Sequence, residues 1–151
     1  MKPHRLWMYT ILIARCGVAN VLAHAQSEPR GRVHVPVSCS AVAQTPCDRA
    51  VALLPSFWYA EAVHAFAEVT KTEPHGAMGY WGIAMRLWYP LWYPPSQAAL
   101  QQGAAAVEQA QATKAPTARE PVSMAAIAAC YNDAATLDHR PRAVAYEAAM
   151  E

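Results

Sequence analysis

Charged side chains are scarce in this 151-residue chain: Lys, Arg, Asp and Glu make up 15% of it, against 54% hydrophobic residues. Disordered chains have the opposite balance, so the composition predicts one folded domain with a modest core. The few charges nearly cancel, with 12 basic and 11 acidic residues, and they form no basic stripe. The chain therefore lacks the electrostatic footprint of a nucleic-acid-binding protein, and we exclude that class.

The sequence also contains no apolar run of about 20 residues, the length that a membrane-spanning helix needs. Its start has a different pattern: the basic "MKPHR" is followed by the apolar "LWMYTILIA", and "LAHA" ends in an Ala-x-Ala cleavage signature at Ala23 and Ala25. This order predicts a signal peptide over residues 1–25 and export to the periplasm or the extracellular space. The alternative is an N-terminal core helix, which Arg15 favours by interrupting the apolar segment. A lipid anchor at Cys16 is disfavoured, because its chemistry needs a small residue in the place of Arg15.

Cysteine is also rare. After removal of residues 1–25, three remain: Cys39, Cys47 and Cys130. In an oxidising compartment Cys39 and Cys47 could pair across a short loop, and the pairing stays open at this point. Cys130 lies in an Ala-rich segment and is expected to be a small buried apolar side chain. No C-x-x-C or C-x-x-C-H motif occurs, so redox motifs and covalent haem attachment have no support.

Catalytic signatures are missing as well. The histidines after the predicted signal peptide are scattered, with neither an H-E-x-x-H motif nor the Cys/His spacing of a zinc site. Gly76, Gly79 and Gly82 form a G-x-x-G-x-x-G series, but no strand precedes it, so close helix packing is a better interpretation than phosphate binding. Glu61 and Glu68 lie seven residues apart with no sign of a cleft. We therefore expect no enzyme activity, no metal and no cofactor.

The pattern that is present is helical. Residues 26–46 look like an extended lead-in, in which "RVHVPVS" could form an edge strand that Pro36 disfavours. From Asp48, a possible N-cap, helical periodicity continues, with Ser96 and Asp138 as further caps and Thr117 and Glu120 as a capping box. The expected helices span residues 48–54, 56–71, 76–89, 96–114, 118–133 and 139–151. The fold class is all-α, with a helical domain over residues 47–151.

One spacing is more specific than general helicity. Ala62, Phe66, Val69 and Pro74 follow A-x-x-x-F-x-x-[small/apolar]-x-x-x-x-P, which resembles the second helix and closing proline of a tetratricopeptide repeat. The apolar positions expected for the first helix of a following repeat are occupied by Tyr80, Ile83, Ala84 and Leu87. Over residues 33–151 the chain resembles the N-terminal portion of exported bacterial tetratricopeptide-repeat proteins. The resemblance implies antiparallel helix pairs in an α-solenoid and brings no catalytic residue with it.

Three prolines depart from that pattern: Pro55, Pro121 and Pro141. The last two fall in the first turn of an expected helix, where proline is tolerated because the early N–H groups have no partner inside the helix. Pro55 is expected to end one short helix and to start another. The first helix of the first repeat is therefore the least secure element of the interpretation.

The helix expected over residues 76–89 is apolar on two sides. Besides the repeat positions, it has a stripe of large, adaptable side chains. The four residues "LWYP" that end this helix are repeated directly after it, and the repeat adds a further tryptophan to the stripe. The stripe consists of Met78, Trp81, Met85, Trp88 and Trp92. In tetratricopeptide arrays this side lines a groove that binds peptides. The alternatives are a stiff connector "YPLWYPP" that folds back over the stripe, and a ligand for a proline-recognising module, which the absence of a clean P-x-x-P disfavours.

These observations favour a non-catalytic helical-repeat scaffold that binds a protein or peptide partner through this Met- and Trp-lined groove. The alternative is that the chain is the N-terminal structural segment of a longer enzyme or cofactor-binding protein, whose active residues lie beyond Glu151. A stable repeat array needs about three repeats and a polar cap, which the C-terminal sequence does not obviously supply.

Overall fold

In the computed structural model, residues 33–88, 93–113 and 117–151 are described, and they all belong to the compact unit Arg32–Glu151. Within these residues all the regular secondary structure is helical, and no β-strand is present. The α-helices and one short 3-10 helix are α2 (Ala41–Ala52), η1 (Leu54–Ser56), α3 (Tyr59–Thr72), α4 (Ala77–Leu87), α5 (Gln97–Ala112), α6 (Arg119–Tyr131) and α7 (His139–Met150). The expected all-α fold class is confirmed. The edge strand expected within residues 32–38 is not formed in its described part.

The first helix begins earlier than Asp48. Ser40 is the N-cap of α2, and its hydroxyl accepts a hydrogen bond from the N–H of Ala43. Pro46 lies inside this helix, although a proline normally disrupts a helix interior. The carbonyl that Pro46 leaves without a helical partner belongs to Val42, which is 75% exposed, so water can hydrate it. The extended lead-in therefore ends at Ser40 and not at residue 46.

The other helix ends follow the sequence more closely. Pro55 lies in η1, directly after α2, so it divides the run as expected. Phe57 then takes a left-handed backbone conformation, with φ of 58°, which turns the chain into α3. Ser96 caps α5 by accepting from the N–H of Ala99. Asp138 occupies the N-cap position of α7, but its side chain forms no capping hydrogen bond.

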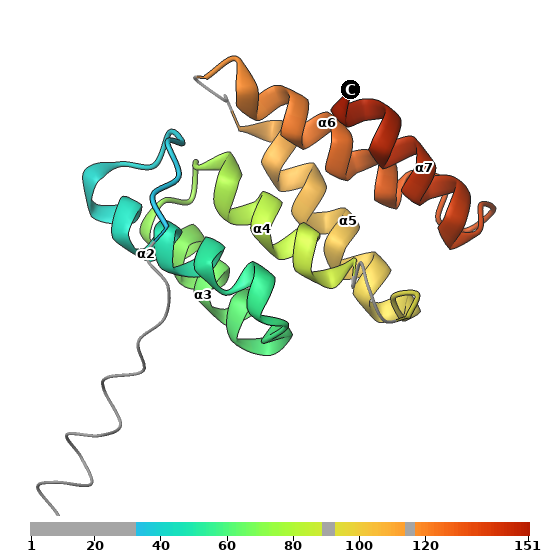
Figure 1. Cartoon of the computed structure of the whole chain (residues 1–151), viewed down its shortest axis with the longest axis horizontal. Coiled ribbons are helices and arrows are strands. Elements are labelled where there is room, and N and C mark those ends of the chain that lie inside the picture. Colours follow the sequence, from blue (N-terminus) through green and yellow to red (C-terminus); the bar gives the residue numbers. More distant parts are fainter. Residues whose placement is uncertain (1–32, 89–92, 114–116) are drawn as a thin grey trace, which may run out of the picture. The chain divides into compact units, whose positions relative to one another are not determined.

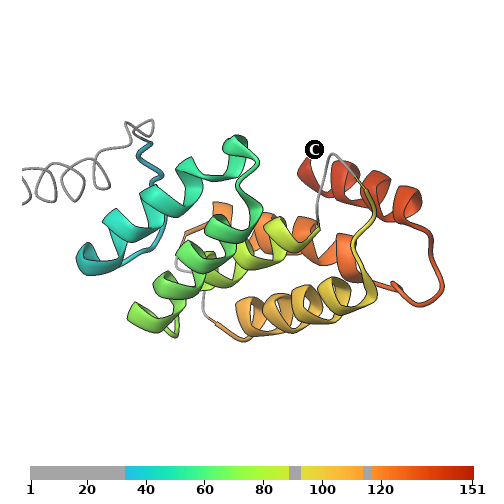
Figure 2. The ribbon, with the colours of Figure 1, turned by 90° about the horizontal axis from the view of Figure 1, so that it is seen from below.

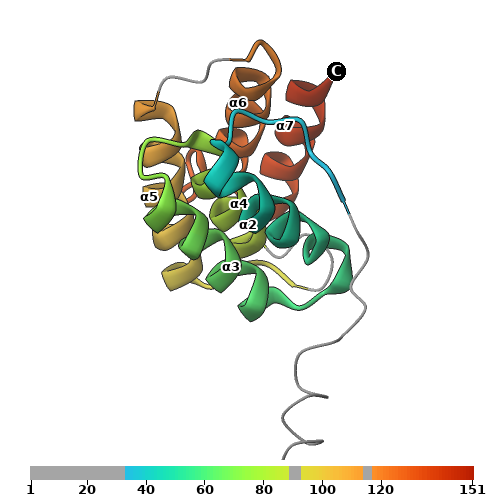
Figure 3. The ribbon, with the colours of Figure 1, turned by 90° about the vertical axis from the view of Figure 1, so that its left-hand side faces the viewer.

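Each helix packs against the next one in the chain, and α3 to α7 lie side by side in chain order (Figure 1). Contacts also join α2 to α4 and α4 to α6, whereas within the described residues α3–α5 and α5–α7 have no comparable contact. Figures 2 and 3 show the same neighbours from two further directions. Helix α4 therefore has more helical neighbours than any other described element, which explains why it is apolar on both sides.

Two glycines allow neighbouring helices to approach closely. A Cβ atom on Gly82 of α4 would lie 2.2 Å from the ring of Phe66 on α3, and one on Gly103 of α5 would lie 2.1 Å from the ring of Tyr131 on α6. In the pair of Phe66 and Gly82 the aromatic residue comes before the glycine in the sequence, and in the pair of Gly103 and Tyr131 it comes after it. The Tyr131 hydroxyl passes Gly103 and donates a hydrogen bond to the carbonyl of Ala84 on α4. The expectation that the glycines serve close packing is confirmed for Gly82.

Candidate functional site

The expected partner-binding stripe lies between helices of the same chain. Met78 and Trp88 are 7% and 4% exposed, and Trp81 and Met85 are partly buried against the same clusters of core residues. These clusters contain residues of α5 and α6, so packing within the chain covers the stripe. The expectation of an open groove lined by Met78 and Trp88 is therefore corrected. Trp92 lies outside the described residues.

Trp88, one residue of this stripe, is surrounded by side chains of α6 and α7. The ring of His139 stacks on it with a centroid distance of 4.3 Å, and the ring of Tyr131 meets it edge-on at 5.9 Å. The guanidinium of Arg142 lies over the indole, 4.9 Å from the ring centroid. Arg142 is itself buried and donates to the carbonyl of Cys130 at 2.7 Å. Trp88 therefore joins α4 to α6 and α7, and burial together with the Arg142 charge lowers the pKa of His139.

The expected repeat-core positions are mostly buried. Ala62, Phe66 and Ala84 have no exposed surface, and Val69 and Leu87 are 1% and 6% exposed. Tyr80 and Ile83 are partly buried, whereas Pro74 is exposed after the end of α3. The Tyr80 hydroxyl donates to the carbonyl of Pro74. Ala62, Phe66 and Val69 are thus the buried residues of α3.

A buried arginine was not anticipated from the sequence. Arg86 on α4 is 3% exposed, and its guanidinium lies over the ring of Tyr59, 3.6 Å from the centroid. One of its nitrogens donates to the carbonyl of Leu54 in η1 at 3.4 Å. The cation thus ties α4 to the turn that Pro55 creates. Nothing in the local sequence distinguishes this arginine from a solvated one.

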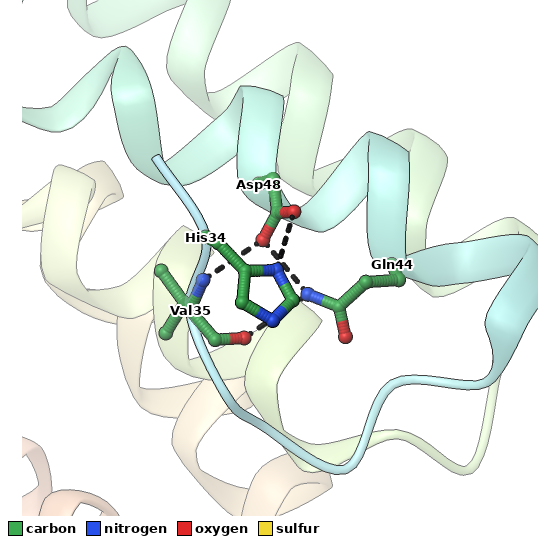
Figure 4. A network of polar contacts seen from close by, with 4 residues as sticks. All are labelled: His34, Val35, Gln44 and Asp48. Atoms are coloured by element: carbon green, nitrogen blue, oxygen red, sulfur yellow. Dashed lines mark hydrogen bonds and ion pairs between the residues drawn. The ribbon is translucent and has the colours of Figure 1, made fainter. Parts of the chain in front are cut away.

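Several polar side chains make long-range contacts that the sequence analysis did not predict. They surround an extended segment, residues 33–40, which we call the strap. Its first contacts are with α2 (Figure 4). Asp48 accepts from the N–H of Val35 at 3.0 Å and pairs with the His34 ring at 3.2 Å. Gln44 donates to the carbonyl of Val35 at 3.0 Å and to Asp48 at 2.7 Å. The N–H of Val35 is the main cause that lowers the pKa of Asp48, and His34 and Gln44 add to it.

Further along the strap, its hydrogen-bond acceptors are carboxylates from two other helices. Glu120 of α6, which is 2% exposed, accepts from the N–H and the hydroxyl of Ser38, both at 2.7 Å. Glu120 lies in the first turn of α6, where the helix dipole stabilises a negative charge, and this helps to explain a buried carboxylate. Glu73, at the C-cap of α3, accepts from the N–H of Ser40 at 3.2 and 3.0 Å.

The expected capping box at Thr117 is therefore only half formed. The N–H of Glu120 approaches the Thr117 hydroxyl at 3.4 Å, but the Glu120 side chain turns away to bind Ser38. Asp48 is likewise not an N-cap, since it lies within α2. Both residues were interpreted as local caps, and both hold the strap.

The strap also makes apolar contacts. Val37 packs against two core clusters, one formed by residues of α2 and α3 and one by residues of α4, α5 and α6. Cys39 packs against the first of these, which contains Cys47. Hydrogen bonding between the two thiols is the largest cause that raises the pKa of Cys39 and lowers the pKa of Cys47. Cys130 is 1% exposed in another cluster, and burial raises its pKa to about 12.

Within the part of the chain that is described, no three His, Cys, Asp or Glu side chains are grouped so as to hold a metal ion. The helices of that part are also too short or too polar for any of them to cross a membrane. Comparison with protein-family models, with curated proteins and with solved structures found no match.

Proposed function

We propose that this chain is an exported, non-catalytic helical-repeat scaffold that binds an extended segment of a protein or peptide partner. The repeat hypothesis is supported by the order of contacts: each helix packs on the next, and the alternate helices α2, α4 and α6 also touch. In an array of helix pairs these would be the first helices of three consecutive repeats. The packing of Phe66 onto Gly82 also suits the tetratricopeptide pattern, whereas the inverted pair of Gly103 and Tyr131 departs from a regular repeat.

The binding hypothesis rests on the surface beneath the strap. Side chains from α2, α3 and α6 hold the strap mainly by its backbone: the N–H groups of Val35, Ser38 and Ser40 and the carbonyl of Val35 all have side-chain partners. Backbone recognition of an extended segment gives affinity with little dependence on sequence. The same surface could therefore hold an equivalent segment of another chain.

The chemistry of the surface limits the occupant. Its charged groups are the carboxylates of Asp48, Glu73 and Glu120, which accept N–H and hydroxyl donors. An extended peptide with a serine at the position of Ser38 and a neutral or basic residue near Asp48 fits these acceptors. A phosphorylated or acidic residue there would be repelled.

A labelled peptide tests this proposal. The peptide copies residues 32–40 with serine in place of Cys39, and its fluorescence anisotropy is measured against the full chain. His34→Ala with Ser38→Ala weakens the native strap and leaves the surface intact, so this variant should bind the peptide more tightly than the parent chain does. Adding Glu120→Gln should then reduce the binding.

A scrambled peptide of the same composition is the control for charge alone. Equal affinity of the parent and the strap variant, or binding that Glu120→Gln leaves unchanged, would contradict the proposal. Loss of helical circular dichroism in a variant would be detected in the same samples.

A second hypothesis has a separate observation in its favour. Val144 and Met150 on α7 are 55% and 52% exposed, and a further packed helix would cover such side chains. Under this hypothesis the chain is a structural segment of a longer protein whose active residues lie elsewhere. The intact mass of the protein isolated from its own cells decides: a mass well above 16.4 kDa favours it, and a mass at or below that value contradicts it.

A further inference from the structure

Cys39 and Cys47 lie on the two sides of the turn that joins the strap to α2. Cys39 precedes the N-cap Ser40, and Cys47 lies within α2 and is 1% exposed. Cys39 packs against the cluster of buried residues that contains Cys47 and Phe66, so the two thiols belong to one packed region. They are free thiols in this structure.

The strap holds Cys39 in place from both sides. The preceding residue, Ser38, is bound to Glu120 by its N–H and its hydroxyl, and the following residue, Ser40, is bound to Glu73 by its N–H. Because these bonds fix the backbone around Cys39, its thiol stays beside Cys47. Reacting groups that are held together in this way behave as if present at very high concentration, which favours bond formation between them.

We propose that Cys39 and Cys47 are a modification site: in the presence of a small disulfide such as oxidised glutathione they form an intrachain disulfide that ties the strap to α2. This inference does not depend on the proposed peptide binding. It also answers the question of pairing that the sequence leaves open.

The reaction is an exchange in two steps. Cys39 is the partly exposed thiol, so as a thiolate it attacks one sulfur of the small disulfide, forms a mixed disulfide and releases one small thiol. The Cys47 thiolate then attacks the Cys39 sulfur, forms the intrachain bond and releases the second small thiol. The two cysteines together lose two electrons and two protons, and the small disulfide gains both to become two thiols.

The surroundings divide these roles between the two residues. Cys47 is shielded from solvent, so an external disulfide reaches Cys39 first. Once Cys39 carries the mixed disulfide, Cys47 is the thiol of the cluster against which Cys39 packs, so it is placed for the second step. Cys130 cannot compete, because it lies in a different cluster and burial holds its pKa at about 12.

Peptide mapping of the full chain tests the proposal. Trypsin cleaves after Arg32 and Arg49, so both cysteines fall in the single peptide 33–49. The folded chain is incubated with oxidised glutathione, free thiols are alkylated in denaturant, and the digest is analysed by mass spectrometry. The expected result is a peptide 33–49 that carries no alkyl group and is lighter by two hydrogen atoms. The peptide that contains Cys130 should be fully alkylated.

Single substitutions separate the two steps. In Cys47→Ser the mixed disulfide cannot be resolved, so glutathione should remain on Cys39. In Cys39→Ser the buried Cys47 should remain unmodified. A parent peptide 33–49 with two alkyl groups, a stable glutathione adduct on the parent, or a bond from either residue to Cys16, Cys130 or a second chain would each overturn the proposal.

Thermal unfolding supplies a second measurement. A disulfide that closes a nine-residue loop should raise the Tm of the oxidised chain by about 10 °C over the reduced chain, mainly by restricting the unfolded state. The Cys39→Ser variant should show no such rise after the same treatment. An unchanged or lower Tm in a chain with the bond formed would overturn the inference that the bond ties down the strap in its native place.

Discussion

The contact between Gly82 and Phe66 gives the most direct test of how α3 and α4 pack. Gly82→Ala adds a single methyl group, whose carbon would lie 2.2 Å from two atoms of the Phe66 ring and 2.4 Å from a third. An ordinary contact begins at 3.4 Å, so the ring or the helix must move by about 1.2 Å. Phe66 has no exposed surface, and α4 is packed on α5 and α6 as well. Neither side of the contact is free to move.

The expected cost follows from two opposing effects. Adding a methyl group to a tightly packed core costs up to about 3 kcal/mol. Replacing glycine by alanine inside a helix contributes about 1 kcal/mol of stability. We therefore expect Gly82→Ala to lower the free energy of unfolding by about 2 kcal/mol, measured by urea denaturation with far-ultraviolet circular dichroism.

Two comparisons isolate the cause. Gly79→Ala should cost less, because its new carbon would meet the Cγ2 methyl of the half-buried Thr70 at 2.8 Å. Phe66→Leu combined with Gly82→Ala should be less destabilising than the sum of the single changes, since the smaller side chain leaves room for the methyl group. If Gly82→Ala is as stable as the parent or more stable, helix propensity alone decides the outcome and the close approach is refuted.

Three further changes test other parts of the structure. Phe66→Ala should lower the free energy of unfolding by about 3–5 kcal/mol in the same urea assay, because the ring is completely buried; a loss below about 1 kcal/mol would contradict its place in the core. Glu120→Gln should cost about 1.5–3 kcal/mol, because one of the two charged acceptors of Ser38 becomes a donor; equal costs for Glu120→Gln in the parent and in a Ser38→Ala background would show that the loss does not come from this contact. The lowered pKa of His139 means that the unfolded chain binds a proton more readily, so this residue's contribution to stability is complete above the unfolded pKa of about 6.5 and is lost as the pH falls below it. His139→Phe, which keeps a ring on Trp88, should therefore reduce the fall in Tm between pH 7.5 and 5.5, and an unchanged fall would contradict the assignment.

The sequence was sufficient to predict the features that local rules control. The helical periodicity, the N-cap at Ser96, the division of the chain at Pro55 and the buried side of α3 all depend on neighbours a few residues away. Ala62 and Phe66 lie one turn apart on the buried side of α3. For such features the tertiary structure agrees with the local preference.

The features that were missed depend on residues far apart in the chain. Glu120 satisfies the local pattern of a capping box, yet its carboxylate binds Ser38, 82 residues earlier. Met78 and Trp88 form a stripe that could equally line a groove or lie between helices, and only the positions of α5, α6 and α7 decide. In each case the local signal was correct, but a long-range contact determined its meaning.

A surface made by α2, α3 and α6 holds the strap, an extended segment, mainly by its backbone. Amide hydrogen exchange of the strap, followed by NMR in the parent chain and in Glu120→Gln, tests this most directly. We expect the N–H groups of Val35, Ser38 and Ser40 to be protected in the parent, although they belong to no helix or strand, and Ser38 to lose protection in the variant. Exchange of these three amides at the rate of an unstructured peptide in the parent chain would contradict it.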